Sequence, residues 1–317
     1  METAGKEENI MQLFPAYLRE RFEICRFCFS TLQEIRLRAG QPVIFLVNGR
    51  ELFLQNDRSL GAYSEKVWRI SGHEITDILN HICNYSPYAF EDEVRQGFIT
   101  VPGGHRVGLA GQAVLEKHDT IRYLKHIYYL NIRIAHQIPG IADGILPSIY
   151  QNRRPLSTLL LSPPGCGKTT LLRDMIRQIS NGNPWGEGCE VSVIDERSEL
   201  AGSYQGIPQN DIGIRTDILD ACPKLLGMML VIRSMAPRVL AVDEVGSREE
   251  MELLRQAKAS GCQVLATIHA ENIKDMTEKR FMQDALAGGF FERYIVLGKR
   301  NGIPAVTGVF NERMEVC

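Results

Sequence analysis

The chain of 317 residues is long enough for two domains that each bury their own core. Its hydrophobic share of 44% and charged share of 23% are ordinary for a globular protein, and a formal net charge of −2, nearly balanced in both halves, argues against a surface dedicated to nucleic acid. No apolar stretch approaches the roughly 18 residues that span a bilayer, and the acidic start does not resemble a signal peptide, so we expect a cytoplasmic protein.

The front of the chain predicts helices followed by a small mixed domain. Apolar side chains near helical spacing indicate an N-terminal helical segment over residues 1–29. Residues 34–54 alternate as strands around short turns, and Ser71 with Glu74 three positions later predicts a capping box that opens a helix. We therefore predict an α+β domain over residues 30–140.

The remainder, residues 141–317, alternates strands and helices. We expect strands at about 157–161, 190–194, 239–242 and 263–268, and helices at about 169–180, 221–234 and 248–260. This alternation predicts an α/β fold whose parallel sheet is covered by helices on both faces and binds ligands at its carboxyl edge, as in a RecA-like P-loop NTPase domain. The tail around Asn301-Gly302 reads as an antiparallel hairpin.

A glycine-rich loop between the first strand and the first helix of this second domain predicts a nucleoside triphosphate site. Gly165 and Gly167 permit a turn whose backbone N–H groups, together with the helix N-terminus, converge on an anion. Lys168 would bind the β- and γ-phosphate oxygens, and the Thr169 hydroxyl would ligate Mg²⁺. The first glycine of the usual pattern is replaced by Ser162, which we expect to take the turn at some steric cost or by a slightly different path. The predicted nucleotide-binding residues are Ser162, Pro163, Pro164, Gly165, Cys166, Gly167, Lys168, Thr169 and Thr170.

Two further strand ends predict hydrolysis rather than binding alone. The strand at 239–242 runs into Asp243, which would hold Mg²⁺ through a water, and Glu244, which would act as the general base. His269 ends the strand at 263–268, where it would report on the γ-phosphate. The alternative interpretation is a solvated turn with two ordinary surface acids and an exposed histidine. Glu196 also ends a strand at this edge and is the alternative base.

In combination these segments resemble the ATPases of the type II/type IV secretion superfamily. The segments that correspond in order to its Walker A, aspartate, Walker B and histidine boxes are 162–170, 194–200, 243–244 and 267–270. Three segments together resemble, more closely, a sporulation family within that superfamily: 104–108, 131–135 and 195–200. This likeness extends from about residue 30 to the end of the chain.

The resemblance implies a cytoplasmic homohexamer that uses ATP and Mg²⁺. It further implies peripheral association, on the mother-cell side, with membrane proteins of a trans-envelope sporulation channel, whose assembly or transport the ATPase powers. In related secretion ATPases, arginines of the N-terminal domain reach the γ-phosphate, which makes Arg106 and Arg133 candidates. Arg197 and Arg233 are rivals within the nucleotide domain. An ion pair inside their own domain is the alternative role for Arg106 and Arg133.

Two other functions stay open at this stage. A RecA-type nucleic-acid-remodelling ATPase would show turnover that DNA stimulates and salt suppresses, but the charge balance argues against it. A scaffold that binds nucleotide without useful turnover would not need the paired acids. The partners we expect are therefore further copies of the chain and membrane proteins, with no nucleic acid and no transmembrane segment in the chain itself.

Overall fold

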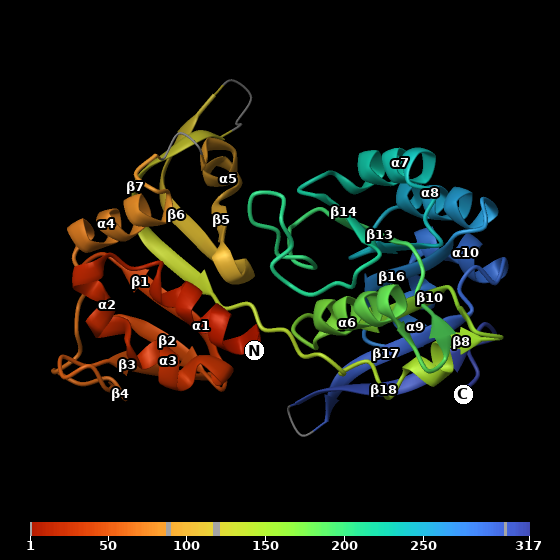
Figure 1. Ribbon diagram of the computed structural model, residues 1–317, viewed down its shortest axis with the longest axis horizontal. Coiled ribbons are helices and arrows are strands. Elements are labelled where there is room, and N and C mark those ends of the chain that lie inside the picture. The colour runs from red at the N-terminus through yellow and green to blue at the C-terminus, as the bar shows by residue number, and fades with distance from the viewer. Residues whose placement is uncertain (1, 87–89, 117–120, 301–302) are drawn as a thin grey trace. The chain divides into compact units, whose positions relative to one another are not determined.

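The computed structural model describes residues 2–86, 90–116, 121–300 and 303–317, and divides the chain into two compact units. Unit 1 comprises residues 1–136 with the segment 202–209, and unit 2 comprises residues 137–201 and 210–317. In Figure 1 most of unit 1 runs from red to yellow, and most of unit 2 from green to blue. Among the described residues, none of the helices combines the length and the apolar content that crossing a bilayer requires.

Unit 1 is built on an antiparallel sheet in the order β4-β3-β2-β1-β7-β6-β5. Its strands are β1 (Leu32–Arg38), β2 (Ile44–Val47), β3 (Arg50–Leu54), β4 (Leu60–Gly61), β5 (Phe98–Val101), β6 (His105–Leu115) and β7 (Ile121–Arg133). Its α-helices are α1 (Glu2–Met11), α2 (Ala16–Phe22), α3 (Ile24–Cys28), α4 (Gly72–Ile82) and α5 (Glu91–Gln96). Short 3₁₀ turns occupy Phe29–Thr31 and Pro102–Gly104.

The N-terminal helices belong to the core of unit 1. Phe14 and Phe22 stack with ring centroids 3.7 Å apart, and both are fully buried in the same apolar cluster as Ile35 of β1. Helix α4 begins with the predicted capping box: the Ser71 hydroxyl accepts the Glu74 N–H at 3.2 Å, and the Glu74 carboxylate accepts the Ser71 N–H at 2.7 Å. The predicted helical segment therefore packs on the sheet that follows it.

Unit 2 is built on a sheet in the order β14-β13-β15-β16-β10-β17-β18, in which all pairs are parallel except β17 with β18. Its strands are β10 (Thr158–Ser162), β13 (Val191–Asp195), β14 (Thr216–Asp220), β15 (Val239–Val242), β16 (Gln263–His269), β17 (Arg293–Arg300) and β18 (Ile303–Asn311). Its helices are α6 (Lys168–Asn181), α7 (Lys224–Ser234), α8 (Arg248–Ala259), α9 (Ile273–Glu278) and α10 (Gln283–Ala287). Smaller elements are the 3₁₀ turns Leu146–Ile149 and Arg280–Met282, and the hairpins β8 (Tyr150–Gln151) with β9 (Arg154–Pro155) and β11 (Gly182–Asn183) with β12 (Gly186–Glu187).

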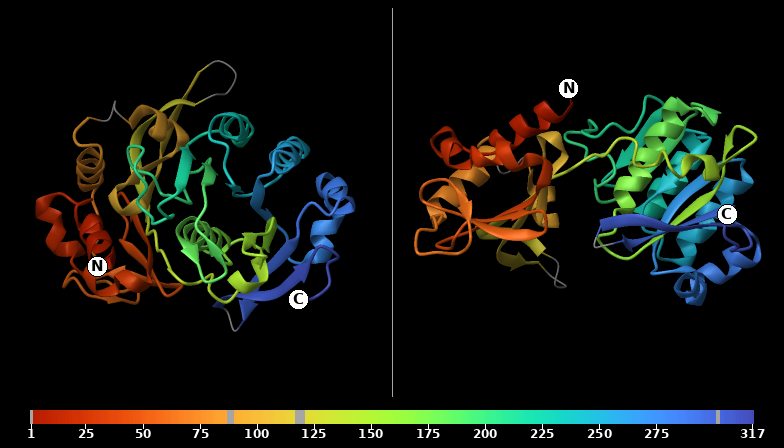
Figure 2. Two further views of the ribbon diagram at one scale, coloured as in Figure 1. Left: turned by 45° about the vertical axis from the view of Figure 1, so that its right-hand side comes forward. Right: turned by 90° about the horizontal axis from the view of Figure 1, so that it is seen from below.

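Helices cover both faces of the unit 2 sheet, as Figure 2 shows from two directions. Helix α6 packs in one apolar cluster with Leu160, whereas α7, α8, α9 and α10 contribute to a second cluster with Leu159 and Leu161. Alternate residues of β10 therefore face opposite layers, and all five are buried. The predicted strands and helices of this region are confirmed within a few residues. The turn of the tail hairpin at residues 301–302 lies outside the described residues.

Candidate functional site

The loop that joins β10 to α6 has the backbone that its glycines predict. Gly165 and Gly167 have φ values of 70° and 82°, in the left-handed region, and Gly167 is the residue before the first turn of α6. A Cβ on Gly165 would meet nothing within 4 Å, and a Cβ on Gly167 would lie 3.6 Å from the Pro304 Cβ. Glycine is therefore required here by backbone conformation rather than by lack of space. The backbone amides of the loop and of the helix N-terminus are those on which an anion would bind.

Of the two alternatives expected for Ser162, the structure has the different backbone path and not the steric cost. Ser162 is the last residue of β10, pairs with His269 of β16, and is not among the residues with positive φ. Its buried hydroxyl donates to the Pro163 carbonyl at 2.7 Å. Because the chain turns only after this position, a side chain is accommodated without strain.

Asp243, which follows β15, contacts both functional side chains at the start of α6. The Thr169 hydroxyl donates to Asp243 Oδ2 at 2.9 Å, and Lys168 Nζ lies 3.5 Å from Oδ1. Lys168 is only 8% exposed, so its ammonium is held at the loop rather than in solvent. A carboxylate and a hydroxyl are the hard oxygen donors that Mg²⁺ takes, and the pair therefore fits the metal assigned to it from the sequence.

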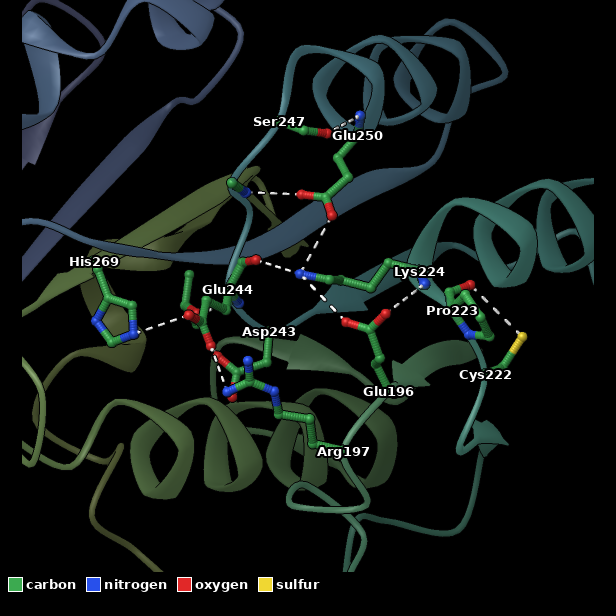
Figure 3. Close-up of polar contacts among 12 residues, drawn as sticks. Glu196, Arg197, Cys222, Pro223, Lys224, Asp243, Glu244, Ser247, Glu250 and His269 are labelled. Carbon is green, nitrogen blue, oxygen red and sulfur yellow. Dashed lines mark hydrogen bonds and ion pairs between the residues drawn. The ribbon is translucent and has the colours of Figure 1, made fainter. Parts of the chain in front are cut away.

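Glu244 is held at its side chain by two groups (Figure 3). Its Oε1 lies 3.2 Å from His269 Nε2, and its Oε2 lies 3.3 Å from Arg197 Nη1. Its backbone is left-handed, with φ of 60°, a conformation that costs a non-glycine residue about 1 kcal/mol. The sequence-assigned residues Glu244, His269 and Arg197 therefore meet at the carboxyl edge of the sheet, beside Asp243. The second nitrogen of the His269 ring, Nδ1, is buried and has no hydrogen-bond partner within the described part of the chain.

Thr267, a fully buried residue of β16, joins the two acids. Its hydroxyl donates to Asp243 Oδ1 and accepts the Glu244 N–H at 2.8 Å, so one hydroxyl uses both its donor and its acceptor here. Its carbonyl accepts the Val245 N–H at 2.8 Å. From the sequence, Thr267 was included only as part of the segment 267–270 that corresponds to a histidine box. The signal that could have found this role is a hydroxyl at the end of the strand next to the acidic one.

Lys224, the first residue of α7, was not singled out from the sequence. Its Nζ donates to the Glu244 carbonyl and lies 3.3 Å from Glu250 Oε1 and 3.7 Å from Glu196 Oε2. Its own N–H donates to Glu196 Oε1 at 3.3 Å. Glu196, the alternative base, is therefore engaged by Lys224. The partners of Lys224 lie 20 to 28 positions away in the sequence, so a local sequence pattern does not predict these contacts.

The acid-rich segment after β13 is a rigid turn around a buried carboxylate. Asp195 accepts the N–H groups of Glu199 and Ala201, both at 2.8 Å, and burial raises the pKa of Asp195. The Arg173 guanidinium of α6 donates to the carbonyls of Leu200 and Glu199, both at 2.6 Å, and burial lowers its pKa. This turn fixes the segment from which Glu196 and Arg197 project.

Arg106 and Arg133 lie in unit 1, as register partners on β6 and β7. The Arg106 guanidinium carbon lies 3.5 Å from the centroid of the Phe98 ring. Arg133 Nε lies 3.9 Å from Glu34 Oε1, and its side chain is 61% exposed. Each of these two contacts is with a residue of the same sheet. Arg233 is exposed in the last turn of α7.

Comparisons with known proteins agree in family and in fold. A family model described as "Sporulation stage III, protein AA" matches residues 4–317. Stage III sporulation protein AA of Bacillus subtilis (strain 168) is 37% identical over 305 residues, which cover 96% of this chain and 95% of that protein.

Two solved structures show the same fold. The ATPase DotB of Legionella pneumophila is 16% identical with a TM-score of 0.58, over 94% of this chain and 81% of that one. The pilus retraction motor PilT, solved with bound ADP, is 17% identical with a TM-score of 0.59, over 90% of this chain and 81% of that one. Identities this low show that this chain shares the fold of these two proteins, and nothing further.

Proposed function

Because the chain belongs to the stage III sporulation protein AA family, we propose that unit 2 binds ATP with Mg²⁺ and hydrolyses it. The observation that carries the proposal is the junction at Asp243, where Thr169, Lys168 and Thr267 from two other elements meet one carboxylate beside Glu244. A purely structural strand end would not need a buried lysine, a hydroxyl and two acids at the mouth of a glycine-rich loop.

In the proposed reaction each of these residues has a separate role. The amides of residues 165–170 and Lys168 Nζ bind the phosphate oxygens, and Thr169 with Asp243 would hold Mg²⁺, which when bound neutralises charge on the β- and γ-phosphates. Glu244 accepts a proton from the attacking water. The water oxygen forms a bond to the γ-phosphorus, and the bond between the γ-phosphorus and the oxygen that leaves with ADP breaks. His269 and Arg197, which now contact the Glu244 carboxylate, are placed to exchange that contact for the γ-phosphate.

We further propose that the site is completed by a neighbouring copy in a homohexamer. Arg133 is supported as a donor to that site because its side chain is largely exposed and its ion pair to Glu34 is long. Arg106, beside it on the next strand, is the second candidate. In this proposal, a domain formed by residues 1–140 presents the two arginines to the nucleotide domain, residues 141–317, of its neighbour. The ring would act in the cytoplasm on membrane proteins of a sporulation channel.

Two substitutions test the assignment. Glu244→Gln keeps the shape of the side chain but cannot accept the proton, so we expect bound ATP to persist and turnover to fall by about 100-fold or more. Arg133→Ala should keep ATP binding and lose turnover, because an arginine of this kind acts on the transition state. Lys168→Ala provides the blank in a phosphate-release assay, and a fluorescent ATP analogue reports binding. Normal hydrolysis by the Glu244 variant would place the base elsewhere, and normal turnover of the Arg133 variant would remove that residue from the site.

A further inference from the structure

The backbone of Glu244, like its side chain, is held by two contacts. Its N–H donates to the Thr267 hydroxyl, and its carbonyl accepts a hydrogen bond from Lys224 Nζ. Glu244 is also in the left-handed region, with φ of 60°. In that conformation the direction in which the side chain leaves the backbone depends on holding both neighbouring peptide groups. Thr267 holds the peptide group before Glu244, and Lys224 holds the one after it.

Lys224 reaches this carbonyl from another layer of unit 2, as Figure 3 shows. It opens α7, and its Nζ lies between the carbonyl and two carboxylates, Glu250 in the first turn of α8 and Glu196 in the turn after β13. The side chains of Lys224 and Glu250 are only 13% and 12% exposed. Water therefore screens this contact less than it screens a surface ion pair.

Glu250 extends the same hold along the chain. While Oε1 faces Lys224, Oε2 accepts the Gly246 N–H at 2.7 Å, and the Glu250 N–H donates to the Ser247 hydroxyl at 3.1 Å. The segment 244–247, which leaves β15 and enters α8, is thus fixed at successive backbone groups. Lys224 is the point at which this segment, α7 and the 195–201 turn are joined.

We propose that Lys224 is a positioning residue for hydrolysis, which fixes the backbone of Glu244 so that the carboxylate is aimed at the attacking water. The proposal rests on the proposed role of Glu244 as the general base. It differs from a nucleotide-binding role because, among the described residues, the polar contacts of Lys224 are with Glu196, Glu244 and Glu250 and not with the residues assigned to nucleotide binding. Loss of its ammonium should therefore lower kcat and leave the affinity for nucleotide unchanged.

Lys258, in the last turn of α8, provides a matched control for Lys224. Lys258 Nζ also donates to a backbone carbonyl, that of Phe290, and lies 3.9 Å from Glu292 Oε2. Its side chain is 28% exposed, so it too is mostly covered. Lys258 thus shares the chemistry of Lys224 but holds a segment away from Glu244.

The experiment compares Lys224→Met with Lys258→Met in the full-length protein. Methionine keeps much of the length and apolar area of the lysine stem and removes the charge and the donors. We expect Lys224→Met to lower kcat by about 10- to 100-fold with KM for ATP unchanged within about two-fold, because a misplaced base costs rate without affecting binding. Lys258→Met should change kcat by less than about two-fold. Lys224→Arg should recover part of the loss, because a guanidinium can donate to the same carbonyl and carboxylates.

Each other outcome overturns the proposal. Equal kcat values for wild type and Lys224→Met would show that Glu244 needs no such hold, and a parallel rise in KM would show a binding role instead. If Lys224→Met does not fold, Glu250→Gln is decisive, because it keeps an acceptor for the Gly246 N–H while weakening the hold on Lys224. We expect Glu250→Gln to have a kcat about three-fold or more below that of the wild type, with KM unchanged. A Glu250→Gln variant with the kcat of the wild type would contradict the proposal. Failure of the proposed function is separate: no hydrolysis by the wild type at any concentration would remove both.

Discussion

Replacing Thr267 with valine is the sharpest single test of how the two acids are arranged. Valine keeps the shape of the buried side chain but removes the hydroxyl that donates to Asp243 and accepts the Glu244 N–H. Losing a hydrogen bond to a charged group costs about 1.5–3 kcal/mol, and leaving a backbone N–H without an acceptor costs about 1–3 kcal/mol. Both losses come from the same hydroxyl, so their costs are not fully additive. We expect the free energy of unfolding to decrease by about 2–5 kcal/mol. For a unit of this size, the corresponding fall in Tm is about 4–20 °C.

The variant should lose turnover even under conditions where it is folded, because the carboxylates of Asp243 and Glu244 lose their orientation. At a temperature where the variant is fully folded, we expect kcat to decrease by about 100-fold with nucleotide binding nearly intact. The control is Thr267→Ser, which keeps the hydroxyl and loses only a methyl group, at a cost of about 1 kcal/mol. Calorimetry and steady-state turnover measure the two effects. A valine variant that unfolds and turns over like the serine variant would refute the inference that this hydroxyl orients both acids.

Three further predictions follow from single contacts. Ser162→Gly should leave turnover unchanged within about two-fold, since Ser162 is extended and contributes only its bond to the Pro163 carbonyl; a large loss in a phosphate-release assay would contradict this. Burial lowers the pKa of His105 from 6.5 to about 4, so the unfolded chain gains a proton on acidification before unit 1 does. Stability should therefore fall as the pH drops from 6.5 to 4, by about 3 kcal/mol at 1.36 kcal/mol per pKa unit, and urea titrations of His105→Gln should lack this slope. Asp195→Asn replaces one of two acceptors by a donor and should cost about 1–3 kcal/mol in the same titrations; an unchanged midpoint would show that the turn does not depend on it.

The elements of unit 2 could be predicted because their signals are local. A run such as Leu159 to Leu161 is apolar throughout, which is typical of a strand buried on both faces, and the glycines of the phosphate loop mark a backbone that few other residues adopt. The strand β14 was missed because Thr216–Asp220 has only two adjacent apolar residues, Ile218 and Leu219, which form neither an apolar run nor an alternation. It pairs in parallel with β13, and that pairing is fixed by tertiary contacts rather than by local pattern.

The site was predicted as a set of strand ends but not as a network. Parallel strands deliver Asp243, Glu244 and His269 to one edge, and that much follows from topology. The contact that Lys224 makes with the Glu244 carbonyl depends on where α7 packs, and the apolar period of a helix shows which face is buried but not which element it packs against. The motif mismatch at Ser162 left strain and a different backbone path open, and only the structure shows that this position is ordinary strand.

The most direct test of the account is ATP turnover measured against protein concentration, with particle size determined in the same samples and Lys168→Ala as the blank. We predict that turnover per chain rises with the fraction of chains in rings and is absent in the blank, because the proposed site includes arginines from a neighbouring copy. Turnover per chain that stays constant from dilute monomers to assembled rings would contradict a shared site. Turnover that the Lys168→Ala variant retains in full would contradict the assignment of the nucleotide site itself.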